Sequence, residues 1–132
     1  MAYGINLFAV IVCIISSWIL GGLWYSKTLF GRFYCDNADK SAPKKMEHPG
    51  MVFGAAFALW TISAFGFAFL VGADPAFAYA VYMGLVVGFC FVSTSLGVNY
   101  AFANRGIKFY LIDSGYHIFQ FMIYGAILGV WH

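Results

Sequence analysis

The sequence predicts an all-α fold, a bundle of four transmembrane helices, from its composition and from the length of its apolar segments. Apolar and aromatic residues make up 63% of the 132 residues, and charged residues only 9%. A soluble domain carries about 25% charged residues. Mean hydropathy is +0.83, which argues against a soluble enzyme and against a disordered chain. No basic patch interleaved with aromatic residues indicates nucleic acid as a partner.

Four apolar segments are each long enough to cross a hydrocarbon core of about 30 Å as a helix. Each crossing must be helical, because unpaired backbone groups cannot face lipid. We expect a single integral membrane domain over residues 1–132. Its spans cover about residues 5–26, 50–72, 76–101 and 108–131, with a long loop at 27–49.

Residues that favour helix ends lie at the borders of these segments. Pro49 opens the second span. Asp74 and Pro75 are typical of an N-cap and of the first helical position of the third span, which predicts a tight hairpin between the second and third spans. Gly106 follows the third span, where a C-terminal glycine is favoured.

The basic residues predict the orientation of the bundle. Five lie in the first loop and two in the region of the third loop, while the N-terminus, the second loop and the C-terminus have none. By the positive-inside rule both basic loops are cytoplasmic and both termini face outward. The chain is therefore expected to be a multi-pass protein of the cell membrane. The basic residues are Lys27, Arg32, Lys40, Lys44, Lys45, Arg105 and Lys108.

Two pairs of glycines have the spacing that lets helices approach closely in lipid. Gly84 and Gly88 form one pair, and Gly125 and Gly129 form the other. Small residues at this spacing serve helix packing inside one chain or association between chains. Both alternatives stay open, so a homo-oligomer through either pair is one of the partners we consider, beside membrane lipid.

The last span carries a polar stripe. Asp113, His117, Gln120 and Tyr124 follow one another by four, three and four residues, which places them on one face of a helix. Ionisable groups inside a membrane are costly and mark functional candidates. Asp113 and His117 could form a hydrogen-bonded pair that locks the bundle, bind a ligand or lipid headgroup, relay protons, or ligate a metal or haem.

Other polar and aromatic residues are expected near the cytoplasmic end of this stripe. Asn99 of the third span and Trp24 and Tyr25 of the first lie at the same level as Asp113. Asn6, Ser16 and Ser17 of the first span are predicted to hydrogen-bond between helices. The candidate ligand-binding residues are Trp24, Tyr25, Asn99, Asp113, His117, Gln120 and Tyr124.

No catalytic or metal-binding motif accompanies this cluster. The sequence lacks paired intramembrane aspartates, a nucleophile elbow, a zinc-protease motif and a phosphate-binding loop. We therefore expect no enzyme and no metal site, and the cofactor is left open.

The leading hypothesis is non-enzymatic binding of a lipid or small amphiphile, or an accessory-subunit role, at the cytoplasmic side of the first, third and fourth helices. The alternatives are an oligomeric small transporter or proton-coupled channel that uses Asp113 and His117, and a membrane enzyme built between subunits.

Two segments resemble the domain-of-unknown-function family 1761. Residues 20–33 read LGGLWYSKTLFGRF, and residues 111–117 read LIDSGYH. Lys27 stands where members of that family often have a proline. The resemblance covers nearly the whole chain and implies a small, mostly bacterial, four-span inner-membrane protein without an assigned activity. The matching positions are Gly22, Trp24, Tyr25, Phe30, Gly31, Asp113 and His117.

Overall fold

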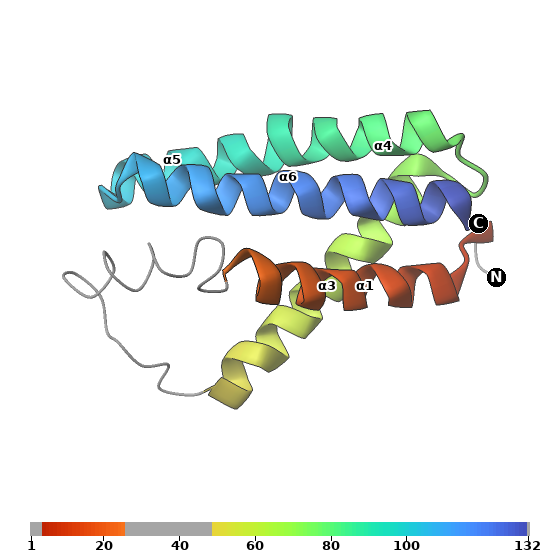
Figure 1. The fold of residues 1–132 in the computed structure, drawn as a ribbon, viewed down its shortest axis with the longest axis horizontal. Helices are drawn as coiled ribbons and strands as arrows, with labels where there is room; N and C mark the ends of the chain where they lie inside the picture. The colour runs from red at the N-terminus through yellow and green to blue at the C-terminus, as the bar shows by residue number, and fades with distance from the viewer. Residues whose placement is uncertain (1–3, 26–48, 132) are drawn as a thin grey trace.

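The computed structural model describes residues 4–25 and 49–131, and these residues are helical apart from short turns (Figure 1). The predicted all-helical fold is confirmed. The predicted loop at 27–49, with its five basic residues and with Phe30 and Gly31, lies outside the described residues except for Pro49.

The described residues form four helical rods at the four apolar segments. The third rod is continuous but changes its hydrogen-bonding pattern twice, because a π-helix, η2, joins α4 to α5. A π-helix pairs residue i with i+5 and accommodates an extra residue in the rod. The helices are α1 (Leu7–Trp24), α3 (Pro49–Val71), α4 (Phe77–Val86), η2 (Val87–Ser93), α5 (Thr94–Ala103) and α6 (Ile107–Val130).

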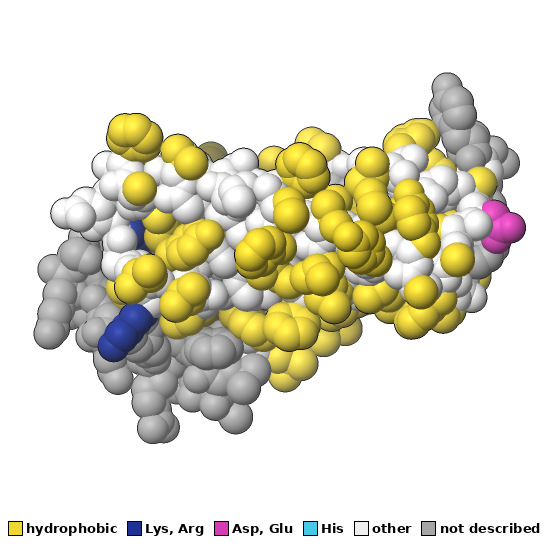
Figure 2. Space-filling view, turned by 90° about the horizontal axis from the view of Figure 1, so that it is seen from above, with side chains coloured by type: hydrophobic (Ala, Val, Ile, Leu, Met, Phe, Trp, Pro, Cys, Tyr) yellow, Lys and Arg dark blue, Asp and Glu magenta, His cyan; other side chains and the backbone are white. Residues whose placement is uncertain are grey.

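Three of the described helices are long and apolar enough to cross a membrane: Leu7–Trp24, Gly50–Val71 and Phe77–Ala103. Many of their large apolar side chains are exposed, as lipid contact requires. Figure 2 shows apolar side chains along the length of one face, with a basic side chain at one end and an acidic one at the other. The fourth helix, α6, is as long as the others but is less apolar, because it carries Asp113, His117 and Gln120.

Glycines bring α6 into backbone contact with the α4–η2 rod, which lies beside it in Figure 1. A Cβ atom on Gly84 would lie 2.2 Å from the carbonyl oxygen of Phe121, and one on Gly125 would lie 2.2 Å from that of Ala80. Gly88 and Gly129 approach the backbone of the opposite helix in the same way. These four glycines therefore pack helices within the chain. Self-association through either pair, the other alternative, would need glycine surfaces that already contact a helix of the same chain.

The main apolar core lies where α1, α3 and α6 meet. Only the second half of α3 contributes buried residues: Ala64, Phe67, Ala68 and Val71. In the first half of α3, large side chains such as Phe53 and Phe57 are exposed. Figure 1 shows the reason, since α3 crosses the other helices at a steep angle and its first half diverges from them.

Two predicted helix ends differ from the structure. The N-cap of α4 is Ala76, so Asp74 and Pro75 belong to the turn before the helix and not to the helix itself. α5 ends at Ala103, and its C-cap, Asn104, adopts the left-handed conformation with φ 56°. Asparagine tolerates this conformation better than most residues. Gly106 was expected at this end but is the N-cap of α6.

The π-helix changes which residues of α5 face α6. In a regular α-helix, which has about 3.6 residues per turn, the residue about three turns after Gly88 would be Asn99. It would lie on the same face of the helix as Gly88. With the extra residue of η2 the inward position falls on Tyr100, which is buried, whereas Asn99 is exposed. The prediction that Asn99 faces inward is therefore wrong, because its neighbour Tyr100 occupies the inward position.

Candidate functional site

The polar side chains of α6 divide into two groups with different partners. The group nearer the start of α6 is centred on the carboxylate of Asp113. Tyr25 donates a hydrogen bond of 2.5 Å to its Oδ1, and Tyr100 donates to its Oδ2. Trp24 donates through Nε1 to the carbonyl oxygen of Ile112 at 2.9 Å. This Asp113 cluster ties the end of α1 and the end of α5 to α6.

Trp24 and Tyr25 are thus placed beside Asp113 as the sequence suggested, but Asn99 is not. Among the described residues no hydrogen bond joins Asn99 to Asp113. Tyr100 makes that contact. The guanidinium of Arg105 lies over the Tyr100 ring, 4.8 Å from the ring centre. Tyr100 was missed because nothing in the sequence signalled the π-helix.

The second group is a buried network one to three turns further along α6. The Nδ1 atom of His117 lies 3.0 Å from Oε1 of Gln120. Nε2 of Gln120 donates to the hydroxyl of Tyr124 at 3.0 Å and to Oγ of Ser17 at 3.3 Å. The hydroxyls of Ser17 and Tyr124 are also hydrogen-bonded to each other. His117 therefore pairs with Gln120, and the pair with Asp113 considered from the sequence is not formed.

Ser17 anchors this network to α1. Its hydroxyl lies 3.4 Å from the carbonyl oxygen of Cys13, and its own carbonyl oxygen accepts a 2.9 Å hydrogen bond from Tyr116. Ser17, Gln120 and Tyr124 are almost completely buried. The predicted role of Ser17 in bonding between helices agrees with this geometry. The same prediction is wrong for Asn6, which caps α1, and for Ser16, which donates to the carbonyl oxygen of Cys13 within its own helix.

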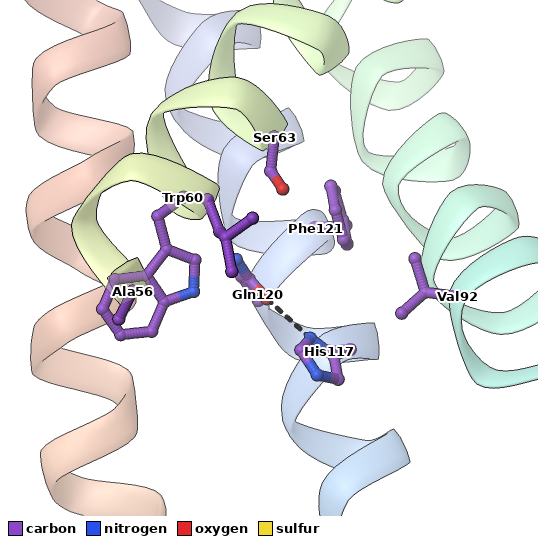
Figure 3. Close-up of a pocket in the computed structure, with 8 residues that line it drawn as sticks. Ala56, Trp60, Ser63, Val92, His117, Gln120 and Phe121 are labelled. Atoms are coloured by element: carbon purple, nitrogen blue, oxygen red, sulfur yellow. Dashed lines mark hydrogen bonds between the residues drawn. The ribbon is translucent and has the colours of Figure 1, made fainter. Parts of the chain in front are cut away.

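A cavity of about 290 Å³ opens beside His117 and Gln120, between the first half of α3 and the π-helix (Figure 3). α6 forms its floor. The diverging course of α3 creates the space, because its first half does not close against η2. The lining is mostly apolar and consists of Ala56, Leu59, Trp60, Ser63, Val92, His117, Gln120 and Phe121.

The cavity contains two of the seven predicted site residues, His117 and Gln120. Trp24, Tyr25 and Asp113 belong to the Asp113 cluster, and Tyr124 supports Gln120 without lining the cavity. The four residues of α3 were missed. The spacing of Ala56, Trp60 and Ser63 indicates that they share one face of a helix. It does not indicate that this face lines a cavity.

Trp60 forms the flat wall of the cavity. Its ring packs edge-on against Trp18 of α1, with 4.8 Å between the ring centres. Edge-to-face contacts of this kind favour a fixed orientation of the rings. Among the described residues no three potential metal ligands come together, and the cavity holds a single imidazole.

Long apolar helices around a largely apolar cavity with a polar floor define a small helical protein of the membrane type. The chain belongs to the family described as "Protein of unknown function (DUF1761)", whose model matches residues 8–129. The resemblance found in two sequence segments is thereby confirmed over nearly the whole chain. No curated protein and no solved structure matches it.

Proposed function

We propose that this chain is a multi-pass protein of the cell membrane that binds a lipid or small amphiphile, without transforming it, in the cavity between α3, η2 and α6. The observation that carries the proposal is the cavity itself. Its volume of about 290 Å³ is close to the lower end of small-molecule sites, which are typically apolar with a few polar groups. This location is deeper than the site we expected from the sequence, and α3 replaces α1 in its wall.

In this proposal α6 is the fourth transmembrane span. Its polar groups support that assignment because they are bonded to other helices or line the cavity instead of facing lipid. Gln120 and Tyr124 are almost fully buried, and Asp113 accepts hydrogen bonds from α1 and α5. Polar side chains within membrane helices face the bundle interior in this way.

The proton-coupled alternative receives less support from the same geometry. It depends on Asp113 and His117 acting as one titrating pair. The two side chains instead have separate partners, tyrosine hydroxyls for Asp113 and the Gln120 amide for His117.

The test is to fill the cavity and measure what the protein retains on purification. Native mass spectrometry in mild detergent should detect an adduct of defined mass on the natural chain. Ala56→Phe should remove the adduct, because position 56 lines the cavity. Ala55→Phe is the matched control, since Ala55 is exposed on the same helix and does not line the cavity.

An adduct that both variants keep, at unchanged occupancy, would place the binding site elsewhere and contradict the proposal. The same holds for a natural chain that carries no adduct and takes up none from added lipid extract. Equal thermal unfolding of the two variants would establish that loss of the adduct is not loss of the fold.

A further inference from the structure

We infer that the ligand of this cavity is an uncharged amphiphile with a hydroxyl group, and that its O–H donates to Nε2 of His117. The inference rests on the proposed function and adds the chemical class of the ligand. It follows from the direction of each hydrogen bond in the buried network beneath the cavity.

The Gln120 amide has one orientation that satisfies all of its hydrogen-bonding neighbours. The contact between the hydroxyls of Ser17 and Tyr124 requires one hydrogen between the two oxygens. If Tyr124 supplies it, Ser17 is left to donate to the carbonyl oxygen of Cys13, which accepts only. Both oxygens then have lone pairs that can accept, and Nε2 of Gln120 faces both of them. In the opposite orientation Oε1 would accept from one of the two hydroxyls. A single hydrogen would then remain for both the contact between the hydroxyls and the bond of Ser17 to Cys13, so one of these contacts would be lost.

The orientation of the Gln120 amide determines which nitrogen of His117 carries the proton. With the NH₂ group of Gln120 directed at Ser17 and Tyr124, its Oε1 faces Nδ1 of His117 and can only accept. Nδ1 must therefore carry a proton. In a neutral imidazole the other nitrogen, Nε2, is then an acceptor. Among the described residues no side chain or backbone group donates to it, and His117 lines the cavity.

Other polar groups of the cavity lining are also available to a ligand. Two further polar groups have no hydrogen-bond partner in the described part of the chain: the indole N–H of Trp60, which only donates, and the hydroxyl of Ser63. Figure 3 shows that Trp60, Ser63 and His117 lie around the same space. A hydroxyl group matches this set because its hydrogen can bond to Nε2 while its oxygen accepts from a neighbouring donor.

The described lining also favours an uncharged ligand over a charged one. Among the residues that the structure describes, the lining contains no lysine, arginine, aspartate or glutamate. A carboxylate or phosphate would lose its hydration in an apolar space without a cation to pair with, and this cost is large. An ether or ester of the same shape would enter but would leave Nε2 without a donor.

The tautomer can be measured without any ligand. A chain labelled with ¹⁵N-histidine, with His48→Gln and His132→Gln, leaves His117 as the one labelled ring. NMR should show a proton on Nδ1 and an unprotonated Nε2. A proton on Nε2, with or without one on Nδ1, would overturn the inference, because Nε2 would then donate instead of accepting.

Three probes of similar shape test the ligand class: 2-naphthol, its methyl ether 2-methoxynaphthalene, and 2-naphthoate. At matched detergent concentration we expect the natural chain to bind the naphthol about three- to tenfold more tightly than the ether, the range for one net hydrogen bond. Naphthoate should not compete. His117→Phe keeps an aromatic ring of similar size but has no acceptor, so it should reduce the ratio of the two affinities to about one.

The results separate the two proposals. Suppose that both neutral probes bind with equal affinity and that Ala56→Phe abolishes their binding. This result would refute the hydroxyl inference and leave the cavity as the binding site. A naphthol preference that persists in His117→Phe would also refute it. If no probe binds in a way that depends on position 56, the cavity itself is not the site and both proposals fail.

Discussion

Ser17 connects α1 to α6 through both its side chain and its backbone. Its hydroxyl bonds to Tyr124 and Gln120, and its carbonyl oxygen accepts from Tyr116. One small residue thus satisfies several buried polar groups, each of which would cost about 1–3 kcal/mol if left unpaired. The network is local to this crossing, whereas the contact of α6 with α4 depends on residues that have no side chain.

Gly125→Ala should destabilise the protein, because the new Cβ would lie 2.2 Å from the carbonyl oxygen of Ala80 and neither backbone can yield without separating the helices. Overpacking of this kind costs about 1–3 kcal/mol. The measurement is thermal unfolding in one detergent, followed by circular dichroism. Gly54→Ala is the control: nothing lies within 4 Å of a Cβ there, so stability should stay equal or rise by up to about 1 kcal/mol. Equal stability of both variants would mean that α4 and α6 are not in backbone contact.

At the scale of elements, the π-helix η2 has two effects. It moves the inward face of α5 from Asn99 to Tyr100, and it places Val92 in the wall of the cavity. π-Helical turns often occur at functional sites. Here the extra residue lies at the level of His117, since Gly88 packs against the His117 and Ile118 backbone.

Deletion of Phe91, which is exposed, should convert the rod into a regular α-helix without rotating α5, because the π-helix holds one residue more than the α-helix needs. The hydrogen bond of Tyr100 to Asp113 should survive. A double-mutant cycle of Tyr100→Phe and Asp113→Asn should then give similar coupling, about 1–3 kcal/mol, in the natural and shortened chains.

An alanine inserted after Phe91 serves as the opposite change. It adds a second extra residue, which should rotate Tyr100 by about 100° and abolish the coupling. Coupling lost in the shortened chain but kept in the lengthened one would show that η2 is not an insertion into an α-helix.

The sequence allowed the four helical segments to be predicted, because long apolar runs have few other solutions in lipid. It also placed Trp24 and Tyr25 beside Asp113, and Ser17 between helices. It did not reveal Tyr100, since one extra residue within a rod leaves no mark in hydropathy. The cavity could not be predicted either, because it depends on the crossing angle of α3, and the helical pattern of Trp60 and Ser63 is compatible with ordinary packing.

At the scale of the whole molecule, charge separates the two ends. Arg105 and Lys108 lie at the turn between α5 and α6, and Asp74 lies in the turn between α3 and α4 at the opposite end. Since the basic end of a membrane bundle faces the cytoplasm, we expect the Asp74 end to face outward together with both termini.

Single cysteines test this orientation in a chain whose three native cysteines are replaced by serine. Ala73→Cys and Ala103→Cys change exposed residues at opposite ends and leave the charged residues intact. A thiol reagent that cannot cross membranes should label the first variant in intact cells, and the second only after the cells are opened. The reverse pattern would invert the predicted topology, and labelling of both in intact cells would mean that the described bundle does not span the membrane as proposed.

The divergence of α3 has a consequence for how a ligand arrives. Only the second half of α3 contributes buried residues, and the stretch that lines the cavity, from Ala56 to Ser63, begins in the half that diverges. If the bundle spans a bilayer, a ligand that passes between α3 and the neighbouring rod would arrive sideways from the hydrocarbon. Partition of the ligand into the membrane would then precede its binding.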